Sequence, residues 1–93
     1  MKTISSIQWT DKSIEHIARH AVKPGEVEEV CFNENESPFI RSGRDGFYYV
    51  FGQTYAGRFL FVVVSFIKQG RVRIVTVRDM NAWERNYFVK RGK

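Results

Sequence analysis

Hydrophobic and polar residues follow the period of helices in the first third of the chain. A short apolar segment, residues 4–9, predicts a first strand. Apolar residues then recur at helical spacing over 11–20, and Thr10 supplies an N-cap for that helix. Pro24 begins a second short helix, which has apolar positions on one face and three glutamates on the other. This part of the chain therefore predicts one strand followed by two helices.

The rest of the chain has the period of strands and ends in a helix. Four strands, the first of them a weak edge strand, are predicted at 38–41, 47–54, 58–67 and 71–78. Asn81 and Glu84 resemble a capping box, which predicts a last helix to about Lys90. The predicted order is β-α-α-β-β-β-β-α. We therefore expect an α+β fold, with an antiparallel sheet of about four to five strands, two N-terminal helices and one C-terminal helix.

Length and composition favour one folded domain. With 93 residues, the chain has room for one modest core, so 1–93 is treated as a single domain. We expect no signal peptide at residues 1–6, and the longest apolar run, 59–64, is too short to cross a bilayer. Cys31 is the only cysteine, and its apolar surroundings indicate a buried small hydrophobe rather than a nucleophile. We expect a cytoplasmic protein without a membrane partner.

Charge is unevenly distributed along the chain. The net charge is +5 and the isoelectric point is near 9.7. Residues 1–57 hold six Lys/Arg and eight Asp/Glu, whereas residues 58–93 hold nine Lys/Arg and two Asp/Glu. This asymmetry gathers cations on neighbouring elements and favours a polyanionic partner. Many small basic proteins bind no nucleic acid, so charge alone leaves both interpretations open.

The last predicted strand carries three arginines. Regular alternation puts one set of residues on one face, Val72, Ile74, Thr76 and Arg78, and the other set on the opposite face, Arg71, Arg73, Val75 and Val77. Arg78 then lies at the strand end, close to the start of the last helix, where free backbone N–H groups favour an anion. An ion pair of Arg78 with Asp79 or Glu84 is an equally strong alternative.

A second arginine, Arg58, begins the preceding strand directly after Gly57. Antiparallel pairing places the start of that strand near the end of the next one, so we expect Arg58 and Arg78 to converge. Two converging arginines suit phosphoryl transfer, because they stabilise charge on the non-bridging oxygens. This convergence is the strongest functional prediction that the residues themselves support.

The first helix carries a basic face made of Lys12, His16, Arg19 and His20. The two histidines are four residues apart, but no third ligand follows at a suitable spacing, so we expect no metal site. A solvated basic face is one interpretation. The other is that His20 or Arg19 lines the same pocket as Arg78, with histidine as a proton shuttle.

Two aromatic residues, Trp83 and Tyr87, share one face of the last predicted helix. An amphipathic helix must bury one of its faces. We therefore expect these two side chains to belong to the core rather than to stack on nucleic-acid bases.

Several segments together resemble a BrnT-type toxin, a small member of the RelE-like ribonuclease superfamily from bacterial toxin–antitoxin pairs. The resemblance covers nearly the whole chain, and 73–78 is its most specific part. The segments that carry it are 7–12, 19–22, 26–32, Gly57-Arg58, 73–78, Glu84-Arg85 and Tyr87. The family usually has lysine-histidine-glycine where this chain has Arg19-His20-Ala21, and arginine is a poor base.

The resemblance implies a RelE-like toxin domain that cleaves RNA without a cofactor, by attack of a ribose 2′-oxygen on its own phosphate, and so inhibits translation. Arg58 and Arg78 would stabilise the phosphate, Arg19 or His20 would position or deprotonate the 2′-hydroxyl, and Tyr87 would donate a proton. The other residues expected to contact RNA are Lys12, His16, Lys68, Arg71, Arg73 and Arg85. A cognate antitoxin would silence the toxin and would alone contact operator DNA. The alternative is a non-catalytic module that binds nucleic acid or an antitoxin.

Overall fold

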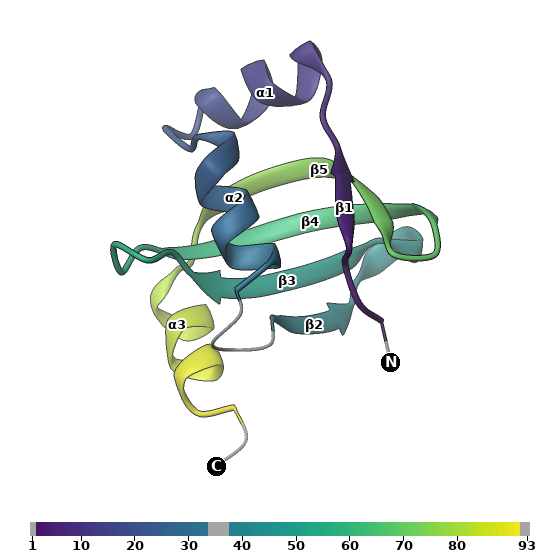
Figure 1. The fold of residues 1–93 in the computed structure, drawn as a ribbon. Helices are drawn as coiled ribbons and strands as arrows, with labels where there is room; N and C mark the ends of the chain where they lie inside the picture. Colours follow the sequence, from purple (N-terminus) through teal and green to yellow (C-terminus); the bar gives the residue numbers. More distant parts are fainter. Residues whose placement is uncertain (1, 34–37, 92–93) are drawn as a thin grey trace.

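The computed structural model describes residues 2–33 and 38–91 (Figure 1). In chain order the elements are β1 (Ser6–Gln8), α1 (Asp11–Ala18), α2 (Pro24–Cys31), β2 (Phe39–Ser42), a single 3₁₀ turn η1 (Arg44–Gly46), β3 (Tyr48–Gln53), β4 (Phe59–Lys68), β5 (Arg71–Asp79) and α3 (Ala82–Val89). This order confirms the predicted α+β fold class. None of the helices in the described ranges has the length and apolar character needed to cross a membrane.

The five strands form one mixed sheet in the order β1-β5-β4-β3-β2. Strands β2 to β5 form the predicted antiparallel meander. The short strand β1 differs, because it lies parallel to the start of β5, with Ile7 opposite Val72. The Ser5 and Ser6 N–H groups both donate to the Gly70 carbonyl, at 2.7 and 3.1 Å, which fixes the N-terminal segment beside the β4–β5 turn.

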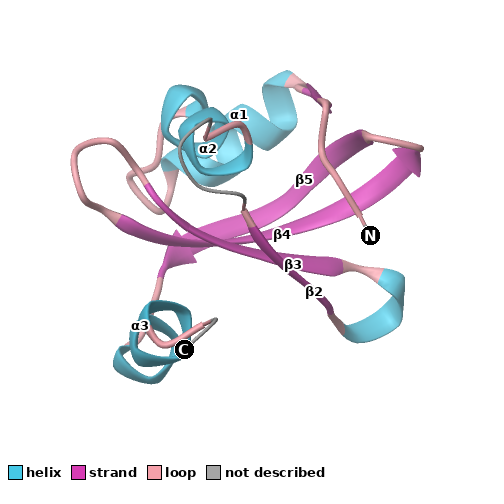
Figure 2. Cartoon of the chain, turned by 60° about the horizontal axis from the view of Figure 1, so that its bottom comes forward, coloured by secondary structure: helices cyan, strands magenta, loops and turns pink. Residues whose placement is uncertain are grey.

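Helices cover the sheet on both faces, with α1 and α2 on one side and α3 on the other (Figure 2). The larger core lies under α1 and α2 and is formed by apolar residues such as Ile17, Val27, Val30, Val50, Leu60 and Val62. Helix α2 lies so close to β3 that a Cβ atom added to Gly52 would be 2.6 Å from Val30 Cγ1. A smaller core on the α3 side contains Phe51, Phe61, Val63, Met80 and Phe88. Strand β4 is covered on both faces, which explains its nearly continuous apolar sequence.

A β-bulge in β5 changes the face to which its last residues belong. Ile74 pairs with Val64 and Thr76 pairs with Val63, so β5 has one more residue than β4 at this point. Ile74 and Val77 are consequently both buried in the core under α1 and α2. The predicted faces of Val77 and Arg78 are therefore wrong, because the extra residue of the bulge exchanges them.

Candidate nucleic-acid interface

An open groove of about 740 Å³ lies on the α3 side of the sheet. Helix α3 covers only one end of this face (Figure 2). Among the described residues, those that line the groove carry aromatic rings, three arginines and one carboxylate. They are Arg41, Ser42, Arg44, Phe47, Tyr49, Phe51, Phe61, Val63, Arg78, Trp83, Glu84 and Tyr87. Arginine and aromatic side chains in one open groove are the groups that bind phosphates and unpaired bases.

Arg78 is held in the groove by a two-pronged ion pair. Its Nη1 and Nη2 donate to Glu84 Oε1 and Oε2, at 2.7 and 2.8 Å, and its guanidinium lies 4.4 Å from the centre of the Phe61 ring. Glu84 also accepts the Asn81 N–H at 2.9 Å, which confirms the predicted capping box of α3. Hydrogen bonds from the Arg78 guanidinium hold the pKa of the Glu84 carboxyl below its usual range. The Arg78 side chain remains 42% exposed, so a ligand in the groove can reach it.

Tyr87 places a hydroxyl group beside a second arginine. Arg41 Nε donates to Tyr87 Oη at 3.3 Å, and the Arg41 guanidinium lies 4.3 Å from the centre of the Phe39 ring. The Tyr87 ring packs against Phe39 and Phe51, with ring centres 5.3 and 5.7 Å apart. Arg41 was not among the site residues predicted from the sequence. Its signal was the alternation within 38–41, which puts Phe39 and Arg41 on the same face of an edge strand.

Trp83 is a surface residue, and the prediction that it belongs to the core is wrong. Its side chain is 68% exposed, and Tyr87 is 38% exposed. Helix α3 instead buries the adjacent face, through Phe88 at 4% and Glu84 at 7% exposure. Trp83 and Tyr87 therefore form an exposed wall of the groove.

Arg58 lies on the side of α1 and α2, where it connects three parts of the chain. Its Nε and Nη2 donate to the Asp79 carboxylate, at 2.7 and 3.3 Å, and its Nη1 donates to Glu26 Oε1 at 3.2 Å. Nη1 and Nη2 also donate to the carbonyls of Ala21 and His20, at 2.7 and 3.2 Å. The Arg58 guanidinium holds the pKa of the Asp79 carboxyl below its usual range. These partners occupy the fork of Arg58 and give it a structural role.

The predicted convergence of Arg58 and Arg78 is therefore wrong. The register does place the start of β4 beside the end of β5, because Phe61 pairs with Arg78. However, Arg78 packs on Phe61 on the α3 side of the sheet, whereas Arg58 binds the α1–α2 turn on the other side. Regular alternation of β5 would have turned Arg78 to the face of the sheet on which Arg58 lies, and the bulge turns it to the other face.

The basic residues of α1 also lie away from Arg78. Arg19 and His20 are exposed just after α1, and neither lines the groove that contains Arg78. The prediction that they share a pocket with Arg78 is therefore wrong. His16 Nε2 lies 3.0 Å from Thr76 Oγ1, and the His16 and His20 rings are 5.8 Å apart.

The other basic residues predicted to bind RNA are spread around the sheet. Lys12, His16 and Arg73 line a separate hollow of about 400 Å³. Arg71 donates to Ser6 Oγ at 3.1 Å, and Lys68 is exposed at the end of β4. The Arg85 guanidinium lies 4.5 Å from the centre of the Phe59 ring. None of these residues lines the α3 groove.

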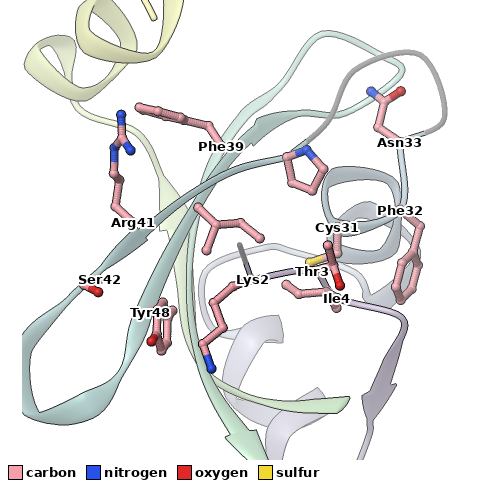
Figure 3. A pocket seen from close by; sticks show the side chains of 12 residues that line it. Lys2, Thr3, Ile4, Cys31, Phe32, Asn33, Phe39, Arg41, Ser42 and Tyr48 are labelled. Atoms are coloured by element: carbon pink, nitrogen blue, oxygen red, sulfur yellow. The ribbon is translucent and has the colours of Figure 1, made fainter. Parts of the chain in front are cut away.

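A further cavity, of about 840 Å³, lies between the N-terminal segment and β2 (Figure 3). The figure shows Ile4 and Cys31 near its centre, whereas Phe39 and Arg41 point away toward α3. Cys31 is buried, as predicted, and burial raises the pKa of its thiol to about 12. The thiol is therefore protonated and does not act as a nucleophile.

Within 2–33 and 38–91, no group of three or more His, Cys, Asp or Glu side chains could hold a metal ion. No protein-family model matches the chain, and no curated protein matches it.

Proposed function

We propose that the protein is the cytoplasmic toxin of a toxin–antitoxin pair and acts as a metal-independent endoribonuclease in the α3 groove. The observation that carries the proposal is that Arg41, Arg78 and the hydroxyl group of Tyr87 line one open groove. Arginines bind a phosphodiester and stabilise charge on its oxygens, and a phenol can donate a proton. Arg41 thus takes the role that the sequence analysis gave to Arg58. The resemblance to BrnT-type toxins supports a cognate antitoxin as partner, through which operator DNA is bound.

In the proposed reaction, a ribose 2′-oxygen attacks the adjacent phosphorus while the bond from phosphorus to the 5′-oxygen breaks. The products are a 2′,3′-cyclic phosphate and a 5′-hydroxyl end. The phosphate takes the fork of Arg78 and thereby releases the Glu84 carboxylate, which accepts the proton of the 2′-hydroxyl. Tyr87 gives its phenol proton to the leaving 5′-oxygen, and Arg41, its hydrogen-bond partner, stabilises the phenolate. No step requires a metal ion.

A second candidate function is RNA binding without cleavage. The observation that favours it is the state of Glu84, whose two oxygens receive Arg78 and the Asn81 N–H. Within residues 2–33 and 38–91, Glu84 is the one carboxylate that lines the groove and could act as a base. A protein of this kind would bind RNA through the same arginines and leave it intact.

The two functions are separated by incubating the protein with single-stranded RNA in the presence of EDTA. We expect the wild type to produce fragments with 2′,3′-cyclic phosphate ends. Arg78→Ala should slow cleavage by about 100- to 1,000-fold. Tyr87→Phe should slow it by about 100-fold or more while RNA affinity stays within about twofold.

Arg73→Ala is the matched control, because Arg73 is exposed outside the groove, and it should cleave at close to the wild-type rate. RNA that is bound by the wild type but stays intact would favour the second candidate. RNA that is neither bound nor cleaved would contradict both functions.

A further inference from the structure

The indole of Trp83 is positioned on the rim of the α3 groove. It lies parallel to the Tyr87 ring, with 14° between the ring planes and 5.2 Å between their centres. The two residues are four positions apart in α3, which puts them on the same side of the helix. Because Tyr87 covers one face of the indole and Trp83 is 68% exposed, a second flat ring can approach the other face.

Tyr87, on which the Trp83 indole rests, is fixed by its own contacts with the sheet. Tyr87 packs on Phe39 and Phe51, and its hydroxyl accepts a hydrogen bond from Arg41. A surface that is already ordered loses little conformational entropy when a ligand binds. The Trp83–Tyr87 pair is therefore prepared to stack before any ligand arrives.

The charges around the pair favour a polyanion that carries flat rings. Arg41, Arg44 and Arg78 line the same groove, and Glu84 is the only carboxylate among the described residues that line it. Phosphates of a nucleic-acid strand can bind the arginines while a base reaches the rim. Stacking of bases on aromatic side chains beside a basic groove is the usual way in which proteins bind single strands.

We infer that the Trp83–Tyr87 pair is a stacking platform for an unpaired base, so that the groove takes single-stranded RNA and rejects duplex RNA. This inference rests on the proposed function and names the substrate class of the same site. In a duplex both faces of each base are covered by its neighbours, so no ring is free to stack on Trp83. The platform positions the strand and takes no part in proton transfer.

The test uses adenine octamers with 2′-O-methyl riboses, which cannot be cleaved, and a second octamer whose two central nucleotides are abasic. The protein carries Trp9→Phe, which leaves Trp83 as its only tryptophan. We expect the adenine octamer to quench the fluorescence of Trp83. Trp83→Ala should weaken binding of this octamer by about 5- to 100-fold. The abasic octamer should bind the Trp9→Phe protein with the same affinity whether or not it also carries Trp83→Ala.

Trp83→Tyr should restore most of the affinity, and Val89→Ala is the control, because Val89 is an exposed apolar residue of the same helix. If the Trp9→Phe protein binds both octamers equally well and Trp83→Ala changes neither affinity, the platform is disproved while the proposed function stands. If the protein binds no single-stranded octamer and cleaves no RNA, the proposed function fails and the platform fails with it.

Discussion

Ile74 and Val77 are buried in the same apolar core although they are three positions apart in one strand. Side chains of a regular strand alternate, so two residues at this spacing would lie on opposite faces. The bulge between them adds one residue to β5 and brings both inside. The same residue turns Arg78 outward to the groove of α3, so this irregularity determines which face carries the candidate site.

Deleting Val75 tests whether the bulge determines the face of the sheet on which Arg78 lies. The deletion removes the extra β5 residue between the pairs Ile74–Val64 and Thr76–Val63, so Ile74, Val77 and Arg78 keep their faces in a strand that is regular at this point. We expect a folded protein that loses about 1–2 kcal/mol of stability and retains RNA binding. The measurement is urea unfolding followed by circular dichroism, together with RNA affinity.

Deleting Val77 is the matched control. It moves Arg78 to the core position of Val77, where an unpaired guanidinium has no partner. We expect no folded protein from this variant. If the Val75 deletion unfolds the protein as completely as the Val77 deletion does, the account of the bulge is wrong.

Arg58 should matter for stability and not for RNA. Arg58→Ala leaves the carboxylates of Glu26 and Asp79 and two carbonyls at the end of α1 without their donor. We expect a loss of about 2–3 kcal/mol in the free energy of unfolding, and Arg58→Lys should recover part of it. The RNA affinity of the folded fraction should stay within about twofold of the wild type. A folded Arg58→Ala protein that no longer binds or cleaves RNA would refute this assignment.

Glu84 should make stability depend on pH. Its pKa is lower in the folded protein, first because of the hydrogen bonds from Arg78, so the ionised carboxylate stabilises the fold. This contribution is complete above the pKa of the unfolded chain, about 4.5, and is lost as the pH falls through the lower, folded value. Glu84→Gln should therefore reduce stability by about 1–3 kcal/mol at pH 7, and the difference from the wild type should shrink below about pH 4. Urea midpoints at pH 7 and pH 3.5 measure both effects. Glu15→Gln, on the exposed side of α1, is the control for the substitution and should leave the urea midpoint at pH 7 unchanged.

Ala21 occupies a position that suits glycine. Its φ is 57°, in the left-handed region, in the turn between α1 and α2. Ala21→Gly should raise the free energy of unfolding by about 0.5–1 kcal/mol, because the strain of the Cβ atom is removed. Ala18→Gly, at the last residue of α1, should lower it by a similar amount, because Ala18 is helical and glycine loses more conformational freedom on folding. Thermal unfolding of the two variants compares them directly, and a stability loss in Ala21→Gly would contradict this explanation of the turn.

The sequence predicted the elements well because each has a clear period or cap. Asn81 with Glu84 marked the start of α3, and the apolar run of β4 marked a strand covered on both faces. The bulge could not be predicted, because Val75, Thr76 and Val77 are all β-branched and fit either face.

The candidate site was predicted only in part. Arg78 and Tyr87 were found, but the partners of Arg58 depend on a long-range contact with Glu26. Helix α3 has aromatic residues on two adjacent faces, so its pattern did not show that Phe88 is buried and Trp83 exposed.

The proposed function requires RNA to bind the α3 side of the sheet and not the side of α1 and α2. Amide chemical shifts of the ¹⁵N-labelled protein, recorded while the uncleavable adenine octamer is added, test it most directly. We predict that the shifts concentrate at Arg41, Tyr49, Arg78 and Trp83. Shifts centred on α1 and on the turn that Arg58 binds, with the groove unchanged, would contradict the account.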